Sequence, residues 1–228
     1  MGLLTRFSRG PASSMSARVR EEGLTYLSAA ALDDLHRTVQ SLETHRVPGL
    51  FIEAGCALGG SALVVAAAKR PERRFNVYDV FGMIPPPGEK DGPDVHRRYE
   101  EIRSGGSTGI KGATYYGYQP DLRQTVTATF HRYGFDPERC HVRFIEGLFD
   151  DTLRIDEPVA LAHIDGDWYD SVFCCLARIE PWLVPGGVLV IDDYDSWSGC
   201  RRAVDEYFAD KHDRFEWVTR ARLHLVRK

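Results

Sequence analysis

The sequence lacks the features that mark several large classes of protein. It has only five cysteines in 228 residues and no C-x-x-C pair, which excludes a disulfide scaffold and favours reduced, buried thiols. Its longest apolar run, residues 58–69, is interrupted by glycine and serine and is too short for a bilayer, which takes about 20 residues. The net charge of −4 gives no basic excess for general nucleic-acid binding. With no apolar signal segment at the start, we expect a cytoplasmic protein that binds neither nucleic acid nor membrane.

The order of apolar patterns predicts an α/β fold in a single domain over residues 1–228. A basic, serine-rich flexible tail is expected over 1–20, and amphipathic spacing indicates N-terminal helices over 21–46. Strands then alternate with helices, which is typical of a mostly parallel sheet. The last two strands have no helix between them and predict an antiparallel hairpin. The seven expected strands are residues 50–52, 75–79, 141–145, 159–164, 187–191, 215–219 and 223–226.

Residues 82–120 interrupt this alternation after the second strand. The segment contains a Pro85-Pro86-Pro87 triplet, many glycines and one charged helical patch near 95–103. A stretch of this length with little regular pattern is typically functional or disordered. We interpret it as a mobile lid whose tyrosines at 115, 116 and 118 contact the bound substrate, since flat rings can cover an apolar face of a ligand. Simple packing of these rings onto the core is the alternative.

Carboxylates follow the strands whose ends meet at one edge of a parallel sheet, where ligands bind. Glu53, Gly55, Gly59 and Ser61 follow the first strand, and Asp79 ends the second. Glycines allow close backbone approach to a ligand, and an acid at the end of the second strand can bind a ribose diol. This pattern indicates a nucleotide-type site. The spacing G-x-x-x-G-G differs from that of dinucleotide binders, and a tight structural turn is the alternative.

A second group of acids follows two later strands. Asp165 ends the strand at 159–164, and Asp192 and Asp193 end the strand at 187–191. One crossover separates the two strands, so these carboxylates should converge and suit a hard cation such as Mg²⁺. A β-turn at 165–167 and a helix N-cap at 192–193 are the alternatives.

Several motifs together resemble the macrocin O-methyltransferase family. They are EAGCALGGS at 53–61, YDVFG at 78–82, FIEGLFDDTL at 144–153, HIDGDWYDS at 163–171, PGGVLVIDDY at 185–194 and GCRRAV at 199–204. The resemblance covers about residues 51–208. It implies a class I methyltransferase (Rossmann-like) fold that uses S-adenosylmethionine and Mg²⁺ to methylate a sugar hydroxyl. Catechol-type methyltransferases carry a lysine where this chain has Trp168, which favours a sugar acceptor.

The resemblance also implies roles for individual residues. Asp165, Asp192 and Asp193 would hold the metal. The resemblance does not assign the base: Asp165 could take the hydroxyl proton while it touches the metal, and His163 on the same strand, His96 and Asp167 are the further candidates. The cofactor site would be lined by Glu53, Gly55, Gly59, Ser61, Asp79 and Glu146.

The glycine- and tyrosine-rich lid departs from the macrolide enzymes of this family. It is more similar to that of mycobacterial methylmannose polysaccharide 1-O-methyltransferases, which implies the 1-OH of a methylated mannose or mannoside as acceptor. A sugar of a glycosylated natural product is the alternative acceptor, and a nicotinamide-dependent oxidoreductase is the alternative enzyme. A homodimer stays compatible with the sequence.

Overall fold

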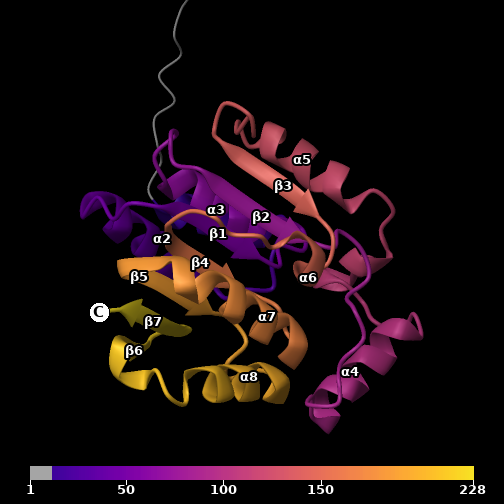
Figure 1. Cartoon of the computed structure of the whole chain (residues 1–228). Coiled ribbons are helices and arrows are strands. Elements are labelled where there is room, and N and C mark those ends of the chain that lie inside the picture. Colours follow the sequence, from indigo (N-terminus) through magenta and orange to yellow (C-terminus); the bar gives the residue numbers. More distant parts are fainter. Residues whose placement is uncertain (1–11) are drawn as a thin grey trace, which may run out of the picture.

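The computed structural model describes residues 12–228 and is built around one seven-stranded sheet (Figure 1). The strand order is β3-β2-β1-β4-β5-β7-β6. Strands β1 to β5 run parallel, whereas β7 is antiparallel to both β5 and β6. The mostly parallel sheet and its C-terminal hairpin are thereby confirmed. The strands are β1 (Leu50–Ala54), β2 (Phe75–Asp79), β3 (Val142–Glu146), β4 (Val159–Ile164), β5 (Leu183–Ile191), β6 (Phe215–Thr219) and β7 (Leu223–Arg227).

Helices cover both faces of the sheet, and each face has its own apolar core. One core packs α1, α2, α3 and α5 on the sheet, and the other packs α7 and α8. Burial on both faces explains why β1 and β4 are completely buried and almost entirely apolar. The α-helices are α1 (Ala12–Glu21), α2 (Ala29–Thr44), α3 (Gly60–Ala68), α4 (Pro93–Arg103), α5 (Leu122–Arg132), α6 (Phe149–Thr152), α7 (Tyr169–Ile179) and α8 (Ser198–Phe208).

Part of the predicted tail is helical. Residues 12–20 lie in α1, where Val19 is fully buried against the first core and Leu24 N–H bonds to its carbonyl at 2.8 Å. Tertiary packing therefore stabilises a basic, serine-containing stretch that has little apolar pattern of its own. Residues 1–11 lie outside the described part of the chain. Within residues 12–228, no helix is both long and apolar enough to cross a lipid bilayer.

The insertion after β2 is packed rather than loose along much of its length. It contains α4 and two single 3₁₀ turns, Ile110–Gly112 and Tyr116–Tyr118; two further 3₁₀ turns, Glu180–Trp182 and His212–Arg214, lie nearer the C-terminus. Val95, Ile102 and Tyr115 are buried. Figure 1 shows α4 beyond the carboxyl ends of the strands, near α8. The segment thus lies beyond the carboxyl ends of the strands, the position expected for a lid, and its mobility remains a prediction.

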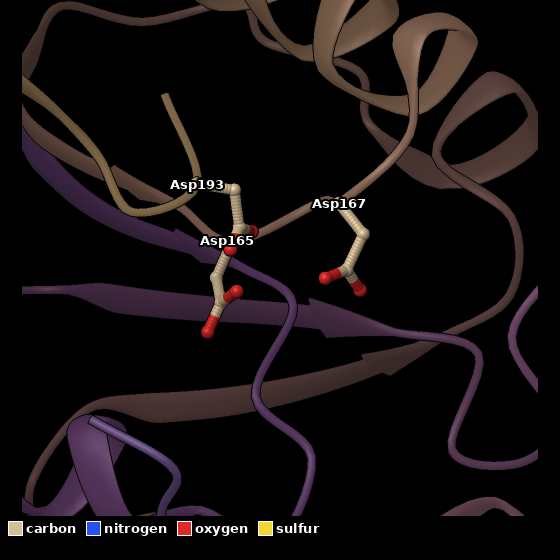
Figure 2. A group of neighbouring side chains, drawn as sticks. All are labelled: Asp165, Asp167 and Asp193. Atoms are coloured by element: carbon tan, nitrogen blue, oxygen red, sulfur yellow. The ribbon is translucent and has the colours of Figure 1, made fainter. Parts of the chain in front are cut away.

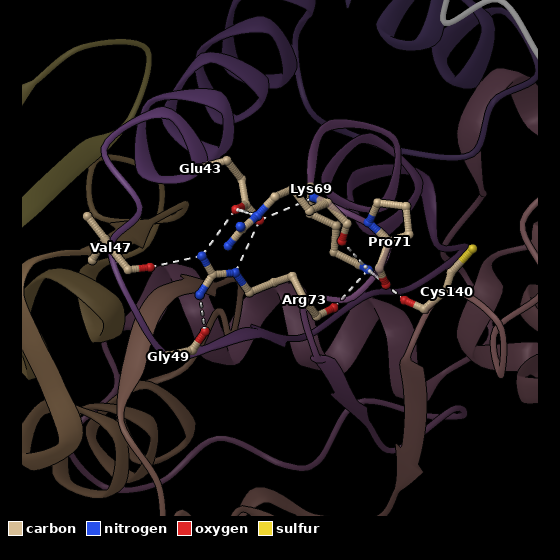
Figure 3. A network of polar contacts seen from close by, with 8 residues as sticks. Glu43, Val47, Gly49, Lys69, Pro71, Arg73 and Cys140 are labelled. Carbon is tan, nitrogen blue, oxygen red and sulfur yellow. Dashed lines mark hydrogen bonds and ion pairs between the residues drawn. The ribbon is translucent and has the colours of Figure 1, made fainter.

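A network of buried cations joins the segments that precede β1, β2 and β3, at the amino ends of these strands (Figure 3). Lys69, only 2% exposed, donates to the carbonyls of Arg73 at 2.9 Å and Cys140 at 2.6 Å. Arg73 forms two bonds of 3.1 Å with Glu43 and donates to the Val47 carbonyl at 2.9 Å. The two cations therefore fasten the chain segments that enter β1, β2 and β3.

Lys69→Met is expected to lower the free energy of unfolding by about 3 kcal/mol, because buried carbonyls lose their donor. Arg74→Met is the matched control: it also removes one cation, but Arg74 is 60% exposed and should cost under about 0.5 kcal/mol. Urea unfolding followed by circular dichroism measures both values. Equal midpoints for the two variants would contradict a structural role for Lys69.

Candidate active site

A cavity of about 550 Å³ opens at the carboxyl ends of the central strands. Its floor comes from the residues after β1, β2, β4 and β5, and its outer wall comes from the insertion. The sheet positions this site, because parallel strands end at the same edge. Residues that line the cavity include Gly55, Ala57, Asp79, Arg98, Tyr115, Leu148, Asp165, Asp167, Trp168, Asp193 and Arg222.

The loop after β1 is held by the carboxylate of Asp79. Asp79 accepts hydrogen bonds from the backbone N–H groups of Cys56 at 2.7 Å, Ala57 at 3.0 Å and Phe81 at 2.7 Å. Burial raises the pKa of Asp79, and the three backbone bonds partly offset that effect. A carboxylate offers about four acceptor positions, so one position on Oδ1 remains, and Asp79 lines the cavity. Asp79 therefore shapes the loop and can still bind a hydroxyl.

Gly55 is required where β1 meets β4. Its φ of +92° lies in the left-handed region, and a Cβ there would stand 1.9 Å from the Asp165 carbonyl. Only glycine permits this contact. The predicted glycine site and the predicted metal site therefore touch directly.

Three other predicted cofactor residues lie behind the loop and do not line the cavity. The Ser61 hydroxyl donates to the fully buried Glu53 carboxylate, and Gly59, with φ of +84°, precedes α3. Glu53 Oε2 is buried and has no hydrogen-bond partner in the described chain. Glu53, Gly59 and Ser61 therefore pack behind the loop that follows β1 and do not face the cavity.

Glu146 also lies outside the cavity lining. It ends β3 in an exposed position, 3.5 Å from Arg123. Leu148 and Phe149 follow it and form an apolar part of the cavity wall.

Three carboxylates gather at the ends of β4 and β5 (Figure 2). Ligand oxygens of Asp165, Asp167 and Asp193 all lie within 4.8 Å of one another. Ile164 pairs with Ile191 in the parallel ladder, so the residues that follow are necessarily neighbours. The backbone of Asp167 has a φ of +54°, in the left-handed region that Asp tolerates better than most residues.

Burial and mutual repulsion oppose the ionisation of the three carboxyl groups in the cluster. Burial and the charges of Asp192 and Asp193 raise the pKa of Asp165 well above its usual range, and burial together with Asp193 does the same for Asp167. Burial and Asp192 raise the pKa of Asp193 to about 6. Asp193 Oδ2 is buried without a hydrogen-bond partner in residues 12–228. An all-carboxylate set of this kind fits a hard divalent cation.

Asp192, predicted as a ligand, lies beside this cluster rather than in it. Its Oδ1 is 2.7 Å from Arg222 Nε and 3.6 Å from His163 Nε2. Burial alone would raise the pKa of Asp192, but these two cations lower it. Asp192 is therefore ionised and partly neutralised by protein groups.

His163 lies beneath the cavity and is fully buried. Its Nδ1 is 3.3 Å from Glu53 Oε1, opposite the contact with Asp192. Burial lowers the pKa of His163, but the two carboxylates outweigh burial and raise it to about 9. The charged His163 side chain thus lies between Glu53 of the predicted cofactor site and Asp192 of the predicted metal site, and it does not line the cavity.

Aromatic rings form the rest of the wall. Trp168 and Trp197 meet edge to face at 5.6 Å, and Tyr115 packs on Tyr116 at 4.4 Å. Tyr118, predicted to contact an acceptor, instead donates its hydroxyl to the Ile102 carbonyl and does not line the cavity.

Sequence reasoning missed Arg98, Arg222, Tyr26 and Trp197, which all line the cavity. Trp197 follows the second acidic motif by four residues, and that position was its only signal. The other three lie far from any motif.

The topology and the strand-end residues define a class I methyltransferase. Strand β7 inserts antiparallel beside β5, a glycine loop follows β1, and an acid ends β2. Solved structures agree. The O-methyltransferase NovP superposes with a TM-score of 0.75 at 26% identity, over 92% of this chain and 88% of that one. The TDP-rhamnose 3′-O-methyltransferase CalS11 shares the fold with a TM-score of 0.55 at 17% identity, over 94% and 92% of the two chains.

The chain belongs to the macrocin O-methyltransferase family, whose profile matches residues 16–216. It is therefore an O-methyltransferase, and the oxidoreductase alternative is wrong. It is 34% identical, over 80% of its length and 67% of the relative's, to an 8-demethyl-8-(2,3-dimethoxy-α-L-rhamnosyl)-tetracenomycin-C 4′-O-methyltransferase of Streptomyces olivaceus. It is 30% identical to the mycinamicin III 3″-O-methyltransferase of Micromonospora griseorubida, over 82% and 71% of the two chains.

Proposed function

We propose that this protein transfers a methyl group from S-adenosylmethionine to a sugar hydroxyl of a glycosylated natural product, with the help of a divalent cation. The observation that carries the proposal is the continuity of one cavity. Asp79 and Ala57 of the loop after β1 line the same cavity as Asp165, Asp167 and Asp193 of the carboxylate cluster. A methyl donor and a chelated hydroxyl could therefore meet in line, which is the main requirement for methyl transfer.

The cofactor would occupy the end formed by β1 and β2. Asp79 has one acceptor position left for a ribose hydroxyl, and Gly55 and Ala57 let the backbone approach. Leu148 and Phe149 would cover the adenine from the β3 side. Glu53 and Ser61 would act indirectly, by fixing the loop.

Asp79→Asn is expected to weaken S-adenosylhomocysteine binding about tenfold, because the amide replaces a carboxylate oxygen that holds two N–H groups. Asp210→Asn, on the exposed surface beyond α8, removes the same charge and should change the affinity less than twofold. Isothermal calorimetry measures both. Binding of NAD⁺ by the wild type without any binding of S-adenosylhomocysteine would contradict the proposed cofactor.

The cation would be held by Asp165 and Asp193, which have carboxylate oxygens within 4.8 Å of each other. Asp192 stays in the proposed ligand set because it lines the cavity and its Oδ2 makes no hydrogen bond within the described residues. A bound Mg²⁺ would supply a Lewis acid that lowers the pKa of an acceptor hydroxyl. Arg222 and His163 would hold Asp192 in place.

Among the candidate bases, Asp167 is the residue that we propose as proton acceptor, in preference to Asp165. It belongs to the cluster and directly precedes Trp168, whose ring packs against Trp197 in the part of the cavity wall where an acceptor would bind. Asp165 is packed against Asp193 and is better placed to hold the cation. His163 does not reach the cavity and would act as a positioning residue for Asp192.

The acceptor would bind between the tryptophan pair and the tyrosines of the insertion. Flat rings suit the apolar face of a sugar, and a cavity of about 550 Å³ shared with the cofactor leaves room for about one sugar unit. The names of the relatives, one of which specifies a rhamnosyl group, support a natural-product glycoside. The 1-OH of a methylated mannoside is the second acceptor to test.

A further inference from the structure

Asp91 of the insertion caps the N-terminus of helix α7, which follows the 165–168 loop of the candidate active site. Asp91, 7% exposed, accepts a hydrogen bond from the backbone N–H of Tyr169 at 2.8 Å with Oδ1 and from Gly88 N–H at 2.9 Å with Oδ2. Tyr169 is the first residue of α7, and the N-cap residue Trp168 makes no side-chain capping bond. Helix α7 therefore takes its cap from a residue 78 positions earlier in the chain.

A second carboxylate of the insertion does the same for α8. Asp94 accepts from Ser198 N–H at 3.0 Å and from the Ser198 hydroxyl at 2.5 Å. Ser198 begins α8, and its N-cap residue Trp197 again provides no side-chain cap. Both uncapped N-cap residues are the tryptophans that line the cavity.

Glycines make these contacts possible. A Cβ on Gly199 would lie 1.8 Å from Asp91 Oδ1, and a Cβ on Gly92 would lie 2.3 Å from the Ser198 hydroxyl. A Cβ on Gly88 would lie 2.1 Å from a carboxylate oxygen of Asp170 in the first turn of α7. Three glycines thus admit the close approach of the insertion to both helices, independently of the hydrogen bonds.

We propose that Asp91 is a positioning residue for methyl transfer, which fixes the 165–168 loop to the segment that walls the acceptor site. Helix α7 begins two residues after Asp167, so its cap sets where that loop leaves β4. The same segment continues into α4, which carries Arg98 into the cavity. The Trp168 ring, whose Nε1 donates to the Pro85 carbonyl at 2.9 Å, strengthens the connection. Loss of the Asp91 contact would consequently displace both the part of the insertion that lines the acceptor site and the carboxylate cluster.

This inference rests on the proposed function for the roles of the cavity residues, and three variants test it. Asp91→Asn removes the charge and one of two acceptor oxygens, and Asp94→Asn makes the same change at α8. Glu89→Gln is the matched control, because Glu89 is an exposed acid of the same segment without a hydrogen bond in the described chain. Each protein is saturated with S-adenosylhomocysteine. The Mn²⁺ dissociation constant is measured by electron paramagnetic resonance, and the rate of tryptic cleavage at Arg97, Arg98 and Arg103 is followed by mass spectrometry.

In Asp91→Asn the Mn²⁺ dissociation constant should rise at least tenfold and cleavage should accelerate at least tenfold, while the affinity for S-adenosylhomocysteine changes less than twofold. Glu89→Gln should match the wild type in all three. A purely structural cap would leave the Mn²⁺ affinity of the folded variant unchanged, and a change of less than twofold overturns the proposal. If Asp91→Asn does not fold, the more exposed Asp94→Asn is judged by the same criteria. If the wild type binds no Mn²⁺, the proposed cation fails, and the cleavage rates alone decide whether Asp91 joins the two elements.

Discussion

Asp193→Asn is expected to lower kcat for methyl transfer about a thousandfold, which corresponds to about 4 kcal/mol of transition-state stabilisation. Asp193 is the buried member of the carboxylate cluster, and its Oδ2 has no hydrogen-bond partner within residues 12–228. Its replacement removes a cation ligand and leaves an amide that binds Mg²⁺ more weakly. The adenosyl end of the cavity does not involve Asp193, so the affinity for S-adenosylhomocysteine should stay within twofold.

Asp195→Asn provides the control for this variant. Asp195 lies two residues away, is 68% exposed and pairs with Arg201, so its loss should leave kcat within twofold. Steady-state kinetics with saturating Mg²⁺ and calorimetry with S-adenosylhomocysteine separate the two effects. An Asp193→Asn enzyme with wild-type kcat in the presence of EDTA would remove the cation from the mechanism.

Asp167→Asn is expected to reduce kcat between a hundredfold and ten-thousandfold, roughly the range of a lost general base. The amide keeps the shape of the side chain but cannot accept the proton of the acceptor hydroxyl. Because we assign the cation mainly to Asp165 and Asp193, the Mn²⁺ dissociation constant should change less than about fivefold.

Asp165→Asn is the informative comparison, since it should lose both Mn²⁺ affinity and turnover. If Asp167→Asn weakens Mn²⁺ binding as strongly as Asp165→Asn does, Asp167 is a cation ligand and the proton goes elsewhere. If Asp167→Asn keeps full turnover, it has neither role.

The sequence predicted the parts of the site that local patterns determine. Asp79 ends an apolar strand, and Asp165, Asp192 and Asp193 directly follow one; parallel strands necessarily place such residues at one edge. The rest depends on contacts between distant segments. Arg222 reaches Asp192 only because β7 pairs with β5, Ile191 opposite Leu223, and no local pattern encodes that neighbour.

Contacts between distant segments also explain why the packing of the insertion was not predicted from the sequence. Its glycines and prolines indicated a flexible lid, yet Asp91 and Asp94 form capping bonds with α7 and α8 that are 78 and 104 positions away. Several of its glycines serve close packing rather than flexibility: Gly92 and Gly88 lie where a Cβ would collide with Ser198 and Asp170. Glycine composition alone cannot distinguish these two uses.

Transfer of a labelled methyl group from S-adenosylmethionine to defined acceptors is the decisive assay of the proposed reaction. The acceptors should be rhamnosylated and other glycosylated polyketides, their aglycones, and methylated mannosides, each with Mg²⁺, with EDTA, and with Mg²⁺ restored. We expect label on a sugar hydroxyl of a glycoside, none on an aglycone, loss of transfer in EDTA and its return with Mg²⁺. Transfer to aglycones alone, or undiminished transfer in EDTA, would contradict it.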